Sequence, residues 1–173
     1  SRNLYHRKLD VISRIQYDIS EWQKDVVIQE IVAQSPLVVC MSKRNPLAHK
    51  KNISWADLRN CRFIVGTSYR MPYYLPMIER NCSREGFVPV ISKVVDCASS
   101  MIYNLKGDME VFICDKFWRD YGNEGYVWKT IKNSQGWLMM EYRKDNYKPE
   151  VEKFVESVRD MIMNQTGEPV IKL

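Results

Sequence analysis

Short apolar runs alternate with helix-like segments along almost the whole chain, and this alternation restricts the fold more than any other feature. The clearest strand candidates are residues 36–41 (PLVVCM), 62–65 (RFIV) and 110–114 (EVFIC). Continuous runs of branched apolar side chains are typical of strands buried on both faces. Strands that alternate with helices predict an α/β fold with a largely parallel sheet.

Two segments carry clear helix signals. Pro72 fits an early helical position, and apolar residues then recur at helical spacing until Gly86, which predicts a helix over about residues 72–85. Pro149 opens the last helix of the chain in the same way. Its predicted apolar stripe consists of Val151, Phe154, Val155, Val158 and Ile162.

The loop RNPLAHKKNISWADL, residues 44–58, connects two of these strands. Asn45 and Pro46 predict a turn, and Ser54 lies three residues before Asp57 in a variant of the capping box, which predicts a short helix. We interpret the loop as a structural connection rather than as an element that contacts a ligand.

The composition excludes several classes of protein. The 173 residues are 45% apolar, enough for one compact domain or two small lobes with a real core. The 26 basic and 21 acidic residues are interspersed, which favours a mixed, solvated surface over a nucleic-acid-binding one. There is no signal-peptide pattern and no apolar run near the roughly 18 residues that cross a bilayer, so we expect a soluble chain without membrane contact.

Five cysteines, an odd number, are spread along the chain without a CxxC pair. This pattern favours reduced core residues of a cytoplasmic protein over a disulfide framework or a zinc site. Neither a GxGxxG nor a Walker loop is present, so we expect no nucleotide cofactor and no metal. The cysteines are Cys40, Cys61, Cys82, Cys97 and Cys114.

The histidines give little support for catalysis. His6 lies in a polar N-terminal stretch and His49 in the basic loop, and neither has a serine, cysteine or carboxylate partner nearby in the sequence. We therefore expect no enzyme. An enzyme that uses Cys97 or Cys114 with a distant histidine is the weaker alternative.

Seven segments, taken in order, resemble the effector-binding domain of LysR-type transcriptional regulators. They are residues 36–40 (PLVVC), 45–48 (NPLA), 53–58 (ISWADL), 62–65 (RFIV), 85–89 (EGFVP), 107–113 (GDMEVFI) and 141–143 (EYR). Asn45 stands where the family usually has histidine, and Asp108 begins a stretch where it usually has small residues. Relative to the family, we expect the chain to lack the start of the domain, the winged helix-turn-helix and the linker helix.

The resemblance implies a type-two periplasmic-binding-protein-like α/β fold, with two lobes that have mostly parallel sheets and are joined by two crossovers. Residues 1–35 would form part of the first lobe, residues 36–134 the second, and residues 135–173 the return to the first. The implied function is a ligand-sensing regulatory domain that binds a small, anionic effector between two lobes of a homodimer or tetramer. DNA would be bound only through the missing N-terminal domain. The alternative is a solute-binding protein of a transport system with the same fold.

The expected effector site begins where a strand gives way to a helix. Thr67, Ser68 and Tyr69 follow residues 62–65, so their hydroxyls and amides could hold a carboxylate beyond the carboxyl end of the strand. Helix capping by Thr67 or Ser68 is the alternative. Arg14 occupies a position where the family often has a cleft residue, and its guanidinium suits a bidentate anion. A plain surface charge is the alternative there.

Cys97 and Ser99 lie at the next strand end and are weaker candidates for contacts with the ligand. For Cys97 we favour core packing over a contact with the ligand. Asp115 and Lys116 follow the strand at residues 110–114, where we favour an ordinary surface ion pair over a role at the hinge.

Overall fold

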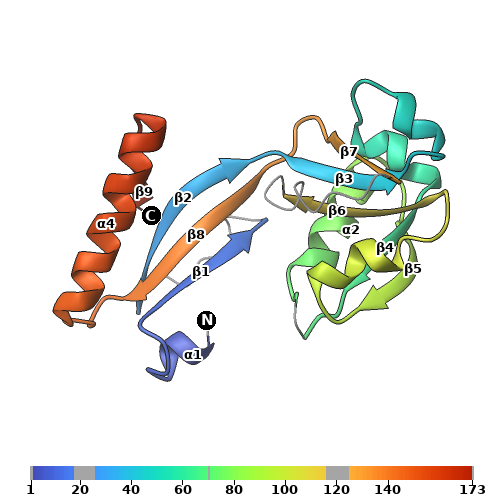
Figure 1. Cartoon of the computed structure of the whole chain (residues 1–173). Coiled ribbons are helices and arrows are strands. Elements are labelled where there is room, and N and C mark those ends of the chain that lie inside the picture. The colour runs from blue at the N-terminus through green and yellow to red at the C-terminus, as the bar shows by residue number, and fades with distance from the viewer. Residues whose placement is uncertain (1, 18–25, 70, 116–124, 173) are drawn as a thin grey trace. The chain divides into compact units, whose positions relative to one another are not determined.

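The computed structural model of the chain describes residues 2–17, 26–69, 71–115 and 125–172 (Figure 1). It divides into two compact units. Unit 1 contains Ser1–Gln34 and Gly136–Leu173, and unit 2 contains Ser35–Gln135. Each unit has its own sheet. No helix in the described ranges is long and apolar enough to span a membrane.

Unit 1 is a four-stranded sheet, with the order β1-β8-β2-β9, covered by the long helix α4 (Figure 1). Strand β1 pairs antiparallel with β8, and β9 pairs antiparallel with β2. The strand β2 carries no clear signal in the sequence, because two consecutive polar residues, Gln29 and Glu30, are both buried, one on each face of the sheet. The elements of unit 1 are α1 (Arg2–Tyr5), β1 (Val11–Gln16), β2 (Val27–Ser35), β8 (Gly136–Arg143), α4 (Pro149–Thr166) and β9 (Ile171–Lys172).

Helix α4 packs one apolar stripe on the sheet of unit 1. Val151 and Val155 contact Met140 and Tyr142 of β8 in a buried cluster. Pro149 opens the helix as predicted, and Gly167, with a φ of 72°, ends it in the left-handed conformation. The prediction is wrong for Phe154, whose exposed fraction is 52%. Adjacent residues of a helix are about 100° apart around its axis, so the Phe154 ring lies to one side of Val155 and outside the face of α4 that contacts the sheet.

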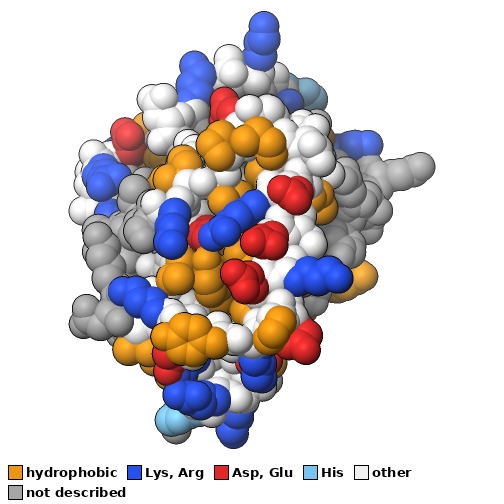
Figure 2. Space-filling model, turned by 90° about the vertical axis from the view of Figure 1, so that its left-hand side faces the viewer, with side chains coloured by type: hydrophobic (Ala, Val, Ile, Leu, Met, Phe, Trp, Pro, Cys, Tyr) orange, Lys and Arg blue, Asp and Glu red, His pale blue; other side chains and the backbone are white. Residues whose placement is uncertain are grey.

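The opposite side of α4 faces solvent. Figure 2 views the molecule from this side and shows exposed hydrophobic side chains among acidic and basic ones. Phe154, Met161 and Met163 are among the exposed hydrophobic residues. The mixed surface expected from the composition is present on this face.

Unit 2 has a five-stranded sheet with the order β5-β4-β6-β3-β7. Its largest fully buried side chains include Phe63, Ile64 and Ile113, which come from the apolar runs that predicted strands. The elements of unit 2 are β3 (Leu37–Ser42), the 3-10 helices η1 (Pro46–His49) and η2 (Trp55–Asn60), β4 (Arg62–Gly66), α2 (Tyr74–Arg84), β5 (Val90–Val95), η3 (Ala98–Ser100, also 3-10), α3 (Met101–Asn104), β6 (Glu110–Asp115) and β7 (Tyr126–Thr130).

The strand directions correct one detail of the predicted fold, the mostly parallel sheets. Strand β4 is parallel to β5 and to β6, but β3 is antiparallel to both of its neighbours, β6 and β7. Parallel neighbours need a crossover connection, which helices α2 and α3 supply here between β4, β5 and β6. The sheet of unit 2 is therefore mixed, and the pairs described for unit 1, β1 with β8 and β2 with β9, are antiparallel. The fold remains within the predicted α/β class.

The loop between β3 and β4 is held by its own polar side chains. The Asn45 side chain is fully buried, accepts a hydrogen bond from the Leu47 amide at 2.9 Å and donates to the Asp108 carbonyl at 2.8 Å. The Asp57 carboxylate accepts a hydrogen bond from the Ser54 amide at 2.8 Å, as the capping motif predicted. These contacts support a structural role for the loop.

Candidate functional site

The parallel strands of unit 2 bring several of the predicted site residues to one edge of the sheet. Because β5, β4 and β6 run in the same direction, their carboxyl ends meet at this edge. The segment after β4 begins with Thr67, and the segment after β5 contains Cys97. A hydrogen bond of 2.9 Å from the Thr67 amide to the Val95 carbonyl joins the two segments. We call this region the strand-end edge; its candidate residues are Thr67, Ser68, Tyr69, Cys97 and Ser99.

Thr67 offers a polar group that unit 2 does not use. Its Oγ1 atom is buried and forms no hydrogen bond with any residue in the described part of the chain. Leaving a buried hydroxyl unpaired costs about 1 to 3 kcal/mol. The hydroxyl of Thr67 is therefore poorly explained by stability alone.

Gly66, the last residue of β4, leaves room for the Met71 side chain next to Thr67. A Cβ atom at this position would lie 2.3 Å from the sulfur and 3.1 Å from the Cβ of Met71, so a larger residue would displace that side chain. The Met71 amide donates to the Thr67 carbonyl at 2.8 Å, which closes the turn. The close packing of Met71 on Gly66 thus holds Thr67 at the strand end.

The capping alternative for Thr67 and Ser68 is not supported. Helix α2 begins at Tyr74, with Tyr73 as its N-cap and without a hydrogen bond from a capping side chain. Ser68 is exposed, and the exposed fraction of Tyr69 is 89%. These two side chains therefore lie on the surface beside the buried hydroxyl of Thr67.

Cys97 is exposed, so the core packing considered for it is wrong. The other four cysteines are buried, and burial raises the pKa of the Cys61 thiol to about 11 and that of Cys82 to about 12. Hydrogen bonds from Ser99 and Ser100 instead lower the pKa of Cys97, with its Sγ 3.3 Å from the Ser99 Oγ. The turn after β5 thus presents a thiol and a hydroxyl together.

Asp115 also lies at this edge, at the end of β6. Only 1% of the residue is exposed, so Asp115 is not the surface residue that the sequence favoured. Lys116, its expected partner, lies outside the described residues. The apolar run before Asp115 could have suggested its burial, because burial continues to the last residue of a strand inside the sheet.

Arg14 belongs to unit 1, apart from the other five candidates. Its guanidinium donates from Nε to the Glu141 carboxylate at 2.6 Å, and Glu141 is fully buried. Gln29 donates to the same carboxylate oxygen at 2.7 Å. Arg14 therefore neutralises a buried charge of unit 1, which is more than the plain surface charge considered from the sequence.

The chain matches a known family over most of its length. The model of the LysR substrate binding domain covers residues 2–162. The chain belongs to this family. LysR substrate-binding domains are parts of transcription regulators rather than of enzymes. No curated protein matches this LysR domain at a significant level.

Solved structures confirm the predicted type of fold for this LysR domain. The effector-binding domain of a BenM variant matches with a TM-score of 0.81 and 12% sequence identity, over 98% of this chain and 79% of that one. The regulatory domain of CcmR from Synechocystis, in complex with 2-PG, matches with a TM-score of 0.78 and 12% identity, over 94% and 78% of the two chains. The LysR family regulator CbnR matches with a TM-score of 0.75 and 17% identity, over 91% and 54%.

The LysR domain spans about half the length of the CbnR chain, 54%, and 79% of the BenM effector-binding domain. The sequence identities of these matches are all below one fifth, so the matches establish the fold alone.

Proposed function

We propose that this chain is the ligand-sensing part of a LysR-type transcription factor and that its effector is a small carboxylate bound at the strand-end edge. The observation that carries the proposal is the buried hydroxyl of Thr67, at the carboxyl ends of parallel strands, for which the described residues supply no hydrogen-bond partner. Ligands of open α/β sheets bind beyond such strand ends. Ser68, Tyr69, Cys97 and Ser99 are the neighbouring groups proposed to contact the same molecule.

Relatives of the chain support a small anionic effector. One matched structure is the BenM effector-binding domain with its effector benzoate, a carboxylate. In the proposal, the Thr67 hydroxyl donates to a carboxylate oxygen, and a hydrogen bond to a charged group is the stronger kind. Arg14, whose guanidinium pairs with Glu141, is proposed as a second contact of the effector.

The proposal extends to the protein that would contain this domain. It is a cytoplasmic regulator, without catalytic activity, that acts as a homodimer or tetramer and binds DNA through a separate N-terminal domain. A solute-binding protein of a transport system shares the fold, but the family that matches this chain is that of the regulators.

A thermal-shift titration with benzoate and other small carboxylates tests the proposal. A carboxylate that binds the folded chain at about 100 times its Kd adds about 2.7 kcal/mol to stability and raises the Tm. Thr67→Val removes only the hydroxyl and should weaken binding about tenfold or more, whereas Thr67→Ser should retain it. Thr130→Val, at an exposed position of β7, is the matched control.

Equal carboxylate affinity in Thr67→Val and in the unchanged chain would remove Thr67 from the site. The stability of Thr67→Val without ligand should be unchanged or higher, because the substitution removes an unpaired buried group.

A further inference from the structure

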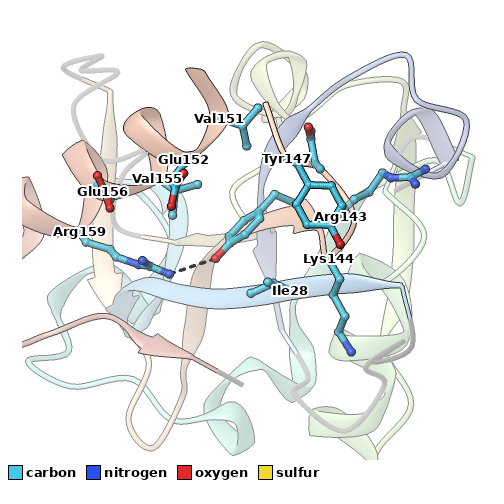
Figure 3. Close-up of a pocket in the computed structure, with 11 residues that line it drawn as sticks. Ile28, Arg143, Lys144, Tyr147, Val151, Glu152, Val155, Glu156 and Arg159 are labelled. Atoms are coloured by element: carbon cyan, nitrogen blue, oxygen red, sulfur yellow. Dashed lines mark hydrogen bonds between the residues drawn. The ribbon is translucent and has the colours of Figure 1, made fainter. Parts of the chain in front are cut away.

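Unit 1 contains a pocket of its own, with a volume of about 290 Å³ (Figure 3). It is formed by β2, the end of β8, the turn that follows β8, and the first three turns of α4. Pockets that bind small molecules measure about 300 to 1,000 Å³, so this one lies at the lower limit and suits a molecule with about one ring.

The floor of the pocket is apolar. Ile28, Val151 and Val155 line it together with the ring of Tyr142. The Tyr142 hydroxyl donates to the Glu30 carboxylate at 2.7 Å and accepts from Arg159 at 3.0 Å, so this polar atom is already satisfied. The floor therefore provides an apolar surface. The apolar part of a ligand that packs on this surface is removed from water.

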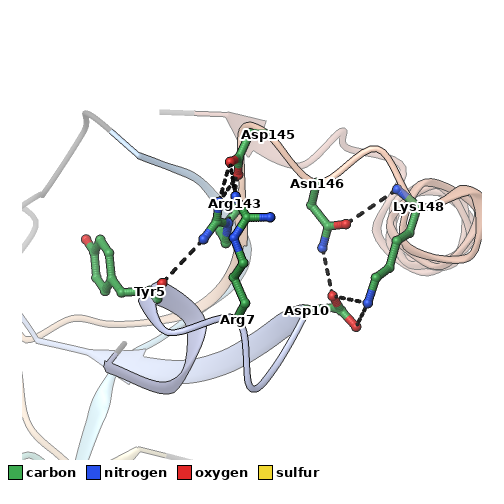
Figure 4. A network of polar contacts seen from close by, with 7 residues as sticks. All are labelled: Tyr5, Arg7, Asp10, Arg143, Asp145, Asn146 and Lys148. Atoms are coloured by element: carbon green, nitrogen blue, oxygen red, sulfur yellow. Dashed lines mark hydrogen bonds and ion pairs between the residues drawn. The ribbon is translucent and has the colours of Figure 1, made fainter.

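The turn after β8, which forms one wall, is held in place by a polar network (Figure 4). Arg143 and Arg7 both pair with Asp145. Lys148 pairs with Asp10 at 2.9 Å. These contacts fasten the turn to the N-terminal segment of unit 1, so the wall is formed before any ligand arrives.

The groups left over at the mouth of the pocket are hydrogen-bond acceptors and negative charges. Within the described ranges, nothing pairs with the carboxylate of Glu152 or with the Tyr147 hydroxyl. Glu156, one turn after Glu152, has an electrostatic contact with Arg159, whose guanidinium donates to the buried Glu30. The Glu152 carboxylate is thus an acidic group of the pocket that no described residue neutralises, and Glu156 lies one turn away from it.

The basic residues of the lining are already engaged. Arg159 is held by Glu30 and Arg143 by Asp145. Lys144 also has an interaction of its own. An anionic ligand would therefore meet Glu152 and Glu156 without gaining a free cation.

We propose that this pocket of unit 1 binds a small organic ammonium compound. Its apolar body lies on Ile28, Val151, Val155 and the Tyr142 ring, and its ammonium group meets Glu152 and Glu156. The ring of Tyr147, which is 88% exposed at the rim, adds a cation–π contact when it turns over the cation. The site uses none of the residues of the strand-end edge and is independent of the function proposed for that edge.

The test is an NMR titration of the 173-residue chain with 2-phenylethylamine and, separately, with 3-phenylpropanoate, which replaces the ammonium group with a carboxylate. We expect saturable shifts in the methyl signals of Ile28, Val151 and Val155 with the amine, at a Kd on the order of millimolar. The anion should leave these signals unchanged.

Charge-neutral variants test the role of the two carboxylates. Glu152→Gln and Glu156→Gln should each weaken amine binding by roughly three- to fivefold, as expected for a partly exposed ion pair. Glu150→Gln is the matched control, because Glu150 is exposed on the same helix but does not line the pocket. Thr67→Val should have no effect on the amine.

Three results would overturn the proposal: no saturable shift with the amine, equal binding of the anion, or an equal loss of affinity in Glu150→Gln and Glu152→Gln. Failure of carboxylates to bind at the strand-end edge would leave this test unaffected, since the two sites share no residue.

Discussion

Replacement of Arg159 with alanine should destabilise unit 1 by about 3 kcal/mol at neutral pH. Arg159 donates to both oxygens of the Glu30 carboxylate, which is fully buried. Removing one partner of a buried ion pair costs about 3 to 5 kcal/mol. The lower end applies here, because 38% of the Arg159 side chain is exposed and Tyr142 still donates to Glu30.

The loss of stability should depend on pH in a defined direction. Burial raises the pKa of Glu30, but hydrogen bonds from Arg159 and Tyr142, with the charges of Arg159 and Lys172, lower it below its usual value. A lowered carboxyl pKa contributes stability above the pKa of the unfolded chain, and this contribution disappears as the pH falls through the folded pKa. Without Arg159, Glu30 protonates at a higher pH. The difference between the two proteins should therefore shrink between about pH 6 and pH 3.

Urea denaturation followed by circular dichroism, at several pH values, measures this difference. Lys153→Ala is the control, since it removes an exposed cation of the same helix and should change stability by less than about 0.5 kcal/mol. Adding Glu30→Gln to Arg159→Ala should recover a large part of the loss, because a neutral amide needs no counter-charge. A loss no larger than that of Lys153→Ala, or one that stays constant with pH, would refute the reasoning.

Two further substitutions address residues first singled out in the sequence. Arg14→Ala should lower the free energy of unfolding by about 2 kcal/mol, because it removes the guanidinium that pairs with the buried carboxylate of Glu141; unchanged stability in urea would limit Arg14 to a role in ligand binding. Of the five cysteines, Cys97 should react with iodoacetamide in the folded chain, at a pH below that needed for an unperturbed thiol with a pKa of about 8.5. Mass spectrometry should find one added group, and none in Cys97→Ser; modification of a buried cysteine at the same rate would contradict the assignment.

The strands of unit 2 could be predicted because their signals are local. The runs at residues 36–41 and 62–65 lie inside the sheet and need no polar partners, so their composition alone predicts burial. The Ser54 and Asp57 pair is also local, and its hydrogen bond is present. A motif predicts well when all the atoms that make it lie within a few residues.

Strand β2 could not be predicted in this way. Gln29 and Glu30 would mark a surface segment, yet both are buried, because their partners Glu141 and Tyr142 come from a strand more than 100 residues later. The same limit applies to Asn45, whose role depends on the Asp108 carbonyl. Polar residues become interior residues only through such distant partners.

At the candidate site, the strand ends could be located from the sequence, but whether each side chain is buried or exposed could not. The order of strand and helix signals placed Thr67 and Cys97 at two strand ends, and the parallel pairing of β4 and β5 brings those ends together. Burial of the Thr67 hydroxyl and exposure of Cys97 depend on packing across the sheet, which no local pattern records.

The two carboxylates inside unit 1 also protect the alignment of its strands. Gln29 and Glu30 are consecutive on β2, and Glu141 and Tyr142 are consecutive on β8, so each strand places one polar residue on each face of the sheet. A slip of β8 by one residue against β2 would exchange the faces of Glu141 and Tyr142, so Glu141 would move away from Arg14 and Gln29, and Glu30 would lose the Tyr142 hydroxyl. A misaligned sheet would therefore contain a buried carboxylate, that of Glu141, without these donors, and this electrostatic cost disfavours the wrong alignment.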